Sequence, residues 1–195
     1  MATHNVRLTP HTDRTPAVVE VSRELSGAQW CARFPGTNEI GALDVSFRSG
    51  VQNFKAAMET AGIGVRVSAT YRPVERAYLM HYAVRVANGS IAPDAVPDLA
   101  GVNIEWDHGE IGASKQAAQA MANAYNIVFP PAYPTRHSLR LAIDMTLANV
   151  RNKTVKDAEG NDVDIGREAD LYPVGASYGV LKLVVDRPHW SDNGQ

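Results

Sequence analysis

Two short stretches in the second half of the chain carry residue types that bind metal ions in hydrolytic enzymes. His137 precedes Asp144 by seven positions, and Asp186 precedes His189 by three. A catalytic zinc ion takes three protein ligands, commonly imidazole nitrogens or carboxylate oxygens, and keeps one position open for water. The sequence has a single cysteine, Cys31, which excludes a multi-cysteine metal site. The candidate ligands are therefore histidines and carboxylates.

The spacing of the first pair matters because a regular strand would point His137 and Asp144 to opposite faces. The apolar alternation of a strand begins only at Leu139, so His137 can lie in the preceding turn and swing to the face of Asp144. The proline inside the second pair cannot donate to a strand ladder, so it ends a strand and lets the chain turn. His189 could then face a metal while Asp186 faces its water as general base. Spacing alone leaves hydrogen-bonded surface groups as the alternative.

Both stretches resemble the motifs of a known peptidase family. Thr135–Asp144 resembles the Ser-x-His-x-x-Gly-x-Ala-x-Asp motif of the zinc D-alanyl-D-alanine carboxypeptidase and L-alanyl-D-glutamate endopeptidase family, which shares its fold with the Hedgehog signalling domain. Asp186–Trp190 resembles the second motif, in which an acid is followed three positions later by a histidine and then by an aromatic residue. Ser68–Pro73 resembles the upstream Ser-x-Tyr-Arg element. The three elements follow the family's order between about residue 45 and residue 195.

The resemblance implies a role for each matched position. His137, Asp144 and His189 would be the zinc ligands, and Asp186 the catalytic base. Arg72 would dock the substrate or the oxyanion, because a fixed cation beside the metal stabilises the negative charge that develops there. The alternative for Arg72 is a solvated arginine at the entrance to a helix.

Four positions bear on specificity. Arg140 stands where the family motif has Gly, and an arginine there could narrow the cleft, bind a substrate carboxylate or be solvated. Thr135 replaces the leading Ser of the motif. Trp190 would contact substrate as an apolar wall or pack behind the ligands. The base is an aspartate, Asp186, as in the L-alanyl-D-glutamate branch, whereas D,D-carboxypeptidases usually carry Glu; this favours cleavage within the peptidoglycan stem peptide.

The elements that position these residues follow from apolar periodicity. Three helices are predicted, over 49–61, 73–87 and 114–125. Strands are predicted over 64–70, 139–147 and 178–185, with an exposed hairpin around 159–161.

Helices and strands in mixed order, without βαβ alternation, predict an α+β fold with a small, mainly antiparallel sheet flanked by helices. The resemblance implies a Hedgehog/DD-peptidase-like version of that fold. Residues 1–30, which are rich in Thr, Pro and Arg, are predicted to form a loosely ordered lead-in to a single zinc peptidase domain over 31–195.

The composition narrows the setting. A formal net charge of −2 argues against a nucleic-acid partner, and no apolar run is long enough for a membrane span. The polar start lacks the apolar core of a secretory signal. A cell-wall enzyme of this kind would reach its substrate after lysis, as a phage endolysin, or through dedicated export, as an antibacterial effector with an immunity or delivery protein as partner.

The resulting expectation is a zinc-dependent peptidoglycan endopeptidase of L-alanyl-D-glutamate or D,D type. A D,D-carboxypeptidase, a cell-wall binding module that keeps zinc but has lost catalysis, and a zinc-free structural domain are the alternatives.

Overall fold

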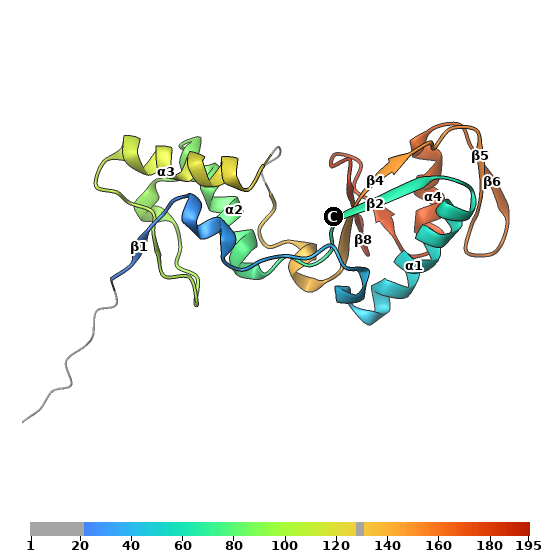
Figure 1. The fold of residues 1–195 in the computed structure, drawn as a ribbon, viewed down its shortest axis with the longest axis horizontal. Coiled ribbons are helices and arrows are strands. Elements are labelled where there is room, and N and C mark those ends of the chain that lie inside the picture. Colours follow the sequence, from blue (N-terminus) through green and yellow to red (C-terminus); the bar gives the residue numbers. More distant parts are fainter. Residues whose placement is uncertain (1–21, 128–130) are drawn as a thin grey trace, which may run out of the picture.

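The computed structural model describes residues 22–127 and 131–195, which form two lobes joined by a narrow waist (Figure 1). One lobe is mainly helical and the other is built on a sheet. The chain crosses between them in the segments near residues 33–39, 70–73 and 131–135. In the described part of the chain, no helix combines the length and apolar character needed to cross a membrane.

The helical lobe is held together by the packing of two helices and the short elements around them. Its members are α2 Val74–Ala87, α3 Ile111–Ala124, the parallel pair β1 Glu24–Leu25 and β3 Ile104–Glu105, and the 3₁₀ helices Ala28–Ala32 and Pro93–Ala95. Its core is rich in aromatic residues, and the indole N–H of the buried Trp106 donates to the hydroxyl of Tyr78 at 3.1 Å. Pro73 precedes α2, as the sequence predicted.

The sheet lobe contains a four-stranded antiparallel sheet in the order β2-β4-β8-β7. Its elements are α1 Val45–Thr60, β2 Gly64–Ala69, β4 Ala142–Ala148, the hairpin strands β5 Lys153–Lys156 and β6 Asp162–Ile165, α4 Leu171–Ser177, β7 Leu181–Lys182, β8 His189–Ser191, and the 3₁₀ helices Ile40–Ala42, Arg136–Leu139 (η4) and Glu168–Asp170. On α1, one face is buried in the core, and its apolar residues recur at helical spacing: Phe47, Val51, Phe54 and Met58.

The register of the sheet decides which side chains face the cleft between the lobes and which face the core. Ile143 is paired with Trp190, and both are fully buried in the core that α1 and α4 cover. The next pair along the same two strands is Asp144 with His189. Because successive side chains on a strand alternate between faces, this second pair lies on the opposite side of the sheet.

The predicted α+β class with small antiparallel sheets is confirmed, as are the helices near α1, α2 and α3, the strand β2 and the hairpin β5–β6. Helices α1 and α3 begin a few residues earlier than predicted, at Val45 and Ile111. The described residues form two separate hydrophobic cores, one in each lobe.

Three predictions about local structure are wrong. The strand predicted over 139–147 begins at Ala142, because η4 occupies the preceding residues and leaves Leu139 57% exposed. Of the strand predicted over 178–185, only β7 forms, and Tyr178 instead caps the end of helix α4, which the sequence did not predict. Pro173 lies in the first turn of α4, where proline is tolerated.

The predicted lead-in is the third. Within residues 1–30, the part from residue 22 onward forms β1 and the start of a 3₁₀ helix, and Trp30 is buried in the helical lobe. Residues 1–21 of that lead-in lie outside the described residues.

Candidate metal centre

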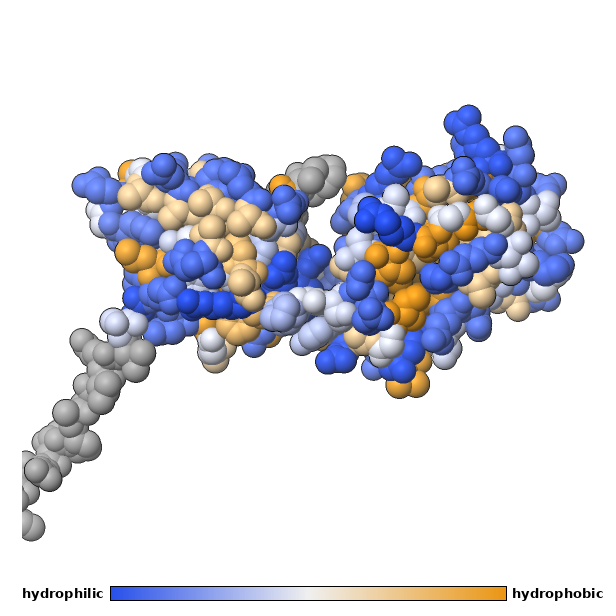
Figure 2. All heavy atoms as spheres, viewed as in Figure 1, coloured by the Kyte–Doolittle hydropathy of each residue, from blue (hydrophilic) through white to orange (hydrophobic). Residues whose placement is uncertain are grey.

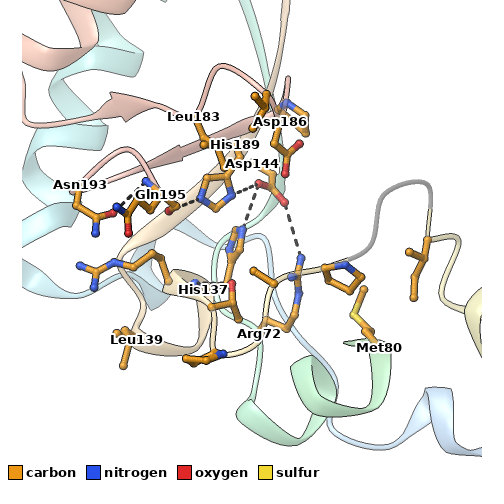
Figure 3. Close-up of a pocket in the computed structure, with 18 of the residues that line it drawn as sticks. Arg72, Met80, His137, Leu139, Asp144, Leu183, Asp186, His189, Asn193 and Gln195 are labelled. Atoms are coloured by element: carbon orange, nitrogen blue, oxygen red, sulfur yellow. Dashed lines mark hydrogen bonds and ion pairs between the residues drawn. The ribbon is translucent and has the colours of Figure 1, made fainter. Parts of the chain in front are cut away.

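Three side chains from three different elements converge on the cleft face of the sheet. His137 comes from η4, Asp144 from β4 and His189 from β8, and one potential ligand atom of each lies within 4.8 Å of the others. Asp144 Oδ1 is 3.2 Å from Nε2 of His137 and 3.1 Å from Nδ1 of His189 (Figure 3). Both imidazoles are buried. The cluster could hold a metal ion.

Each imidazole has an inner nitrogen, which faces Asp144, and an outer nitrogen on the other side of the ring. The partner of the outer nitrogen indicates whether the inner one can bind a metal. Nδ1 of His137 is 3.0 Å from the backbone oxygen of Thr70, and Nε2 of His189 is 3.1 Å from the backbone oxygen of Gln195. A backbone oxygen only accepts hydrogen bonds, so both outer nitrogens carry hydrogen and donate it. In neutral imidazoles the inner nitrogens then direct lone pairs at Asp144, whereas in protonated imidazoles they donate to it. In the neutral form, three acceptors facing one another in a buried place would favour a cation between them.

The electrostatics of Asp144 suit a ligand. Burial raises the pKa of its carboxyl, but the hydrogen bonds and charges of His137 and His189 outweigh that effect, so the pKa lies below its ordinary value. Asp144 is therefore ionised, as a carboxylate must be to bind a metal. Its Oδ2 lies 3.9 Å from Nη2 of Arg72.

Arg72 is placed by the backbone at the waist of the molecule. The backbone N–H of Arg72 donates to the backbone oxygen of His137 at 3.3 Å, which ties the backbone of Arg72 to η4. The nearby Thr70 is fully buried, and its hydroxyl contacts the backbone oxygens of Thr37 and Glu39 at 3.0 and 2.9 Å. Burial lowers the pKa of the Arg72 guanidinium, and the carboxylates of Asp144 and Asp186 partly offset this; an arginine nevertheless stays charged.

The cluster lies in a cleft of about 850 Å³ between the two lobes. Met80, Asn126 and Ile127 of the helical lobe contribute to one wall, and the sheet lobe supplies the wall that carries the cluster. The space-filling view shows the hollow between the two masses (Figure 2). The size of this cleft is typical of a small-molecule or peptide site.

Asp186 lies in the loop between β7 and β8 and lines the cleft beside the cluster (Figure 3). The side chain is partly exposed. Its backbone N–H donates to the oxygen of Leu183, and its backbone oxygen accepts from the N–H of His189, both at 3.1 Å. Within the described residues its carboxylate makes no hydrogen bond, so it is free to accept one from a molecule in the cleft.

Two of the predicted substrate contacts are placed elsewhere. Trp190 is fully buried in the core of the sheet lobe, where the centroid of its ring lies 5.3 Å from that of Phe54. The predicted contact with substrate is therefore wrong. Trp190 instead packs in the core behind the strand that carries His189. Arg140 does not line the cleft: its guanidinium lies over the ring of Tyr71 at 4.3 Å and donates to the oxygen of Ala42 at 3.2 Å.

Arg140 also explains why glycine would suit this position. It ends η4 with a φ of 63°, in the left-handed region that glycine enters without steric cost. The strand predicted over 139–147 would have placed Arg140 on the same face as Asp144, but the observed strand begins only at Ala142.

Other residues at the site have no signal in the sequence that would single them out. The backbone oxygens that orient the histidines have no side-chain signature, so Thr70 and Gln195 cannot be found by residue type. The apolar pattern places Lys182 within a strand, and it does end β7, but its ammonium also donates to three backbone oxygens around Asp186. Burial lowers the pKa of this ammonium, and nearby carboxylates, led by Asp186, offset part of the effect.

Comparisons with protein-family models, with curated proteins and with solved structures found no match for this chain. The function is therefore inferred from the residues and the geometry of the cleft.

Proposed function

We propose that the protein is a zinc-dependent peptidase that hydrolyses an amide bond in the stem peptide of peptidoglycan. One observation carries the proposal: a buried His–Asp–His cluster shares a cleft with the carboxylate of Asp186, which has no partner among the described residues, and with the cation of Arg72. Hydrolysis of an amide needs these three kinds of group together.

Zinc fits the donor set. Two imidazole nitrogens and one carboxylate oxygen, with their outer hydrogen bonds already satisfied, are typical of a catalytic zinc site. A bound zinc ion would polarise the substrate carbonyl and make water a stronger nucleophile. The same donor types also bind non-haem iron(II). A free acid and an arginine beside the cluster favour hydrolysis, and hence zinc.

Asp186 is the proposed general base. Its carboxylate faces the cleft without a hydrogen-bonding partner among the described residues, so it can take a proton from the attacking water. As the carbon–nitrogen bond breaks, the same carboxyl can give that proton to the nitrogen, which then departs as a neutral amine. The partial exposure of the side chain leaves room for both transfers.

Arg72 is the proposed docking group for an oxygen of the substrate. The backbone of Arg72 is held at the waist by its contact with η4, and the guanidinium faces Asp144 without a close hydrogen bond, at 3.9 Å. A donor fixed in this way stabilises an oxygen that gains negative charge, because it need not reorganise during the reaction.

The choice of substrate rests on the motif resemblance, in which the aspartate at 186 favours an endopeptidase of the L-alanyl-D-glutamate type over a D,D endopeptidase or a D,D-carboxypeptidase. The open cleft between the lobes is compatible with an extended stem peptide. Such an enzyme would meet peptidoglycan as an endolysin after lysis or as an exported antibacterial effector.

The test is digestion of purified peptidoglycan by the zinc-loaded protein, followed by mass spectrometry of the muropeptides. We expect new amino and carboxyl termini at one bond of the stem peptide. Asp186→Ala should lower the rate at least 100-fold, the lower end of what loss of a general base costs, while zinc content stays near one ion per chain. Asp94→Ala, at an exposed acid of the helical lobe, is the matched control and should retain full activity.

Absence of any new termini from several types of cell wall would overturn the peptidase proposal. Zinc binding together with sedimentation on intact cell walls would then favour the non-catalytic binding module. If the purified protein took up no zinc even when supplemented, both the peptidase and the binding module would fail.

A further inference from the structure

The loop that carries Asp186 has one ion pair of its own among the described residues, that of Arg187 with Glu168 at 3.1 Å on its exposed side. It spans residues 183–188 between β7 and β8 and includes the largely exposed Val184, at 69%, and Val185, at 86%. The Asp186 carboxylate makes no hydrogen bond to a described residue. A general base must nevertheless stay within hydrogen-bonding reach of the attacking water, so a group that strengthens the backbone hydrogen bonds of the loop would serve the reaction by holding the base in place.

Lys182 is that group. Its Nζ donates to the backbone oxygens of Leu183 and Asp186, each at 2.5 Å, and to that of His189 at 3.1 Å. An ammonium has three N–H donors, and all three are used on the loop and the first residue of β8. The three oxygens belong to the first residue of the loop, to the proposed base and to a candidate metal ligand.

The position of the ammonium is itself fixed from the side of the core. Nζ lies 5.5 Å from the ring centroid of Trp190 and 6.0 Å from that of Tyr172. These rings face a cation that is partly removed from water, where cation–π attraction is stronger than at an exposed site. Lys182 thus joins the rigid core to the exposed loop.

We propose that Lys182 is a positioning residue, which holds the Asp186 carboxylate at its working distance from the metal ligands by binding the backbone oxygens of Asp186 and His189 together. The inference rests on the proposed function, because it assigns Lys182 an effect on catalysis that acts through Asp186.

The three backbone oxygens keep a partner without this lysine, so a variant that lacks the ammonium is expected to fold. Each of the three oxygens already accepts a backbone N–H: Leu183 from Asp186, Asp186 from His189, and His189 from Leu183. Lys182→Met keeps an unbranched apolar side chain as far as Cε and removes the ammonium, and none of these three backbone oxygens is left without a partner.

The experiment compares Lys182→Met with the wild-type protein in zinc-loaded form on muropeptides. We expect kcat to fall about 10–100-fold, as for loss of other supporting contacts around metal sites, with KM and zinc content nearly unchanged. In an Asp186→Ala background, Lys182→Met should cause no further loss, because a residue that acts through the base has nothing left to position. Lys182→Arg, which keeps a cation, should recover part of the activity.

The matched control is Lys156→Met. Lys156 also donates to a backbone oxygen, that of Gly160 at 3.2 Å, but lies on the β5–β6 hairpin. A second readout needs no activity: hydrogen exchange of the Asp186 and His189 amides in metal-free protein should be faster in Lys182→Met and unchanged in Lys156→Met.

The outcomes separate the two proposals. The positioning role would be overturned, and the peptidase proposal left standing, by either of two results. One is turnover of Lys182→Met at the wild-type rate. The other is the same fold-loss of kcat from Lys182→Met in the Asp186→Ala background as in the wild-type background. If the wild-type protein cleaves no peptidoglycan, the peptidase proposal fails and a catalytic role for Lys182 fails with it; the exchange rates then decide whether Lys182 orders the loop.

Discussion

Each histidine of the cluster is oriented by contacts of opposite kinds on its two nitrogens. The outer nitrogen of His137 donates to Thr70 and that of His189 to Gln195, while both inner nitrogens face Asp144. The backbone contacts therefore orient both rings so that one nitrogen of each faces Asp144. Such preorganisation raises affinity, because a ligand that is already in place loses little conformational freedom on binding.

This arrangement predicts how single ligands respond to removal. His189→Ala should lower zinc affinity by more than the roughly 10–100-fold that is usual for loss of an outer contact, because one of three ligands is missing. The control is His81→Ala, which removes a histidine of the helical lobe whose Nδ1 contacts the backbone oxygen of Pro131 at 2.9 Å. Titration against a chromophoric chelator measures both. Equal affinities for the two variants would show that the cluster is not the zinc site.

Residue types and motif order are enough to predict the candidate ligands and Asp186 as one group. They fail where a residue acts through its backbone or its environment. Trp190 looks like a cleft residue in the sequence, yet the register that turns His189 toward the cleft necessarily turns its neighbour into the core. The outer nitrogens of the histidines donate to backbone oxygens of Thr70 and Gln195, and residue type does not predict which backbone oxygens accept.

At the scale of elements, errors in prediction come from apolar residues that are exposed. Leu139 completes an alternating pattern and Val184 and Val185 end an apolar run, both typical of strands, but all three lie in segments outside the sheet. Hydrophobic alternation reports burial, and it misleads where apolar side chains surround a cleft instead of a core. The same feature marks η4 and the β7–β8 loop as the segments that carry site residues.

The end of η4 allows a test of the left-handed residue that separates helix from strand. Arg140→Gly and Arg140→Ala both remove the contacts with Tyr71 and Ala42, but only glycine adopts a φ of 63° without steric cost. We expect the glycine variant to be more stable than the alanine variant by about 1 kcal/mol. Urea unfolding monitored by tryptophan fluorescence gives the difference. An alanine variant at least as stable as the glycine variant would mean that η4 ends differently.

For the whole molecule, the division into two lobes separates the proposed chemistry from part of the substrate wall. All three candidate ligands and Asp186 belong to the sheet lobe, whereas Met80, Asn126 and Ile127 line the cleft from the helical lobe. The fold class can be predicted from the sequence, but two cores cannot, because most of the helical lobe is inserted between neighbouring strands β2 and β4. Only spatial pairing reveals that interruption.

Two separate cores predict that the lobes respond differently to the same loss of packing. Met58 on α1 and Met121 on α3 are both fully buried, one in each core, so replacement of either by alanine should cost about 2–5 kcal/mol locally. We expect Met58→Ala to release zinc at a lower urea concentration than the wild-type protein, since its core supports β4 and β8. Met121→Ala should release zinc at the wild-type concentration while KM for muropeptides rises. Equal shifts in zinc release would show that the lobes unfold as one cooperative unit, because then damage to either core would reach the ligands.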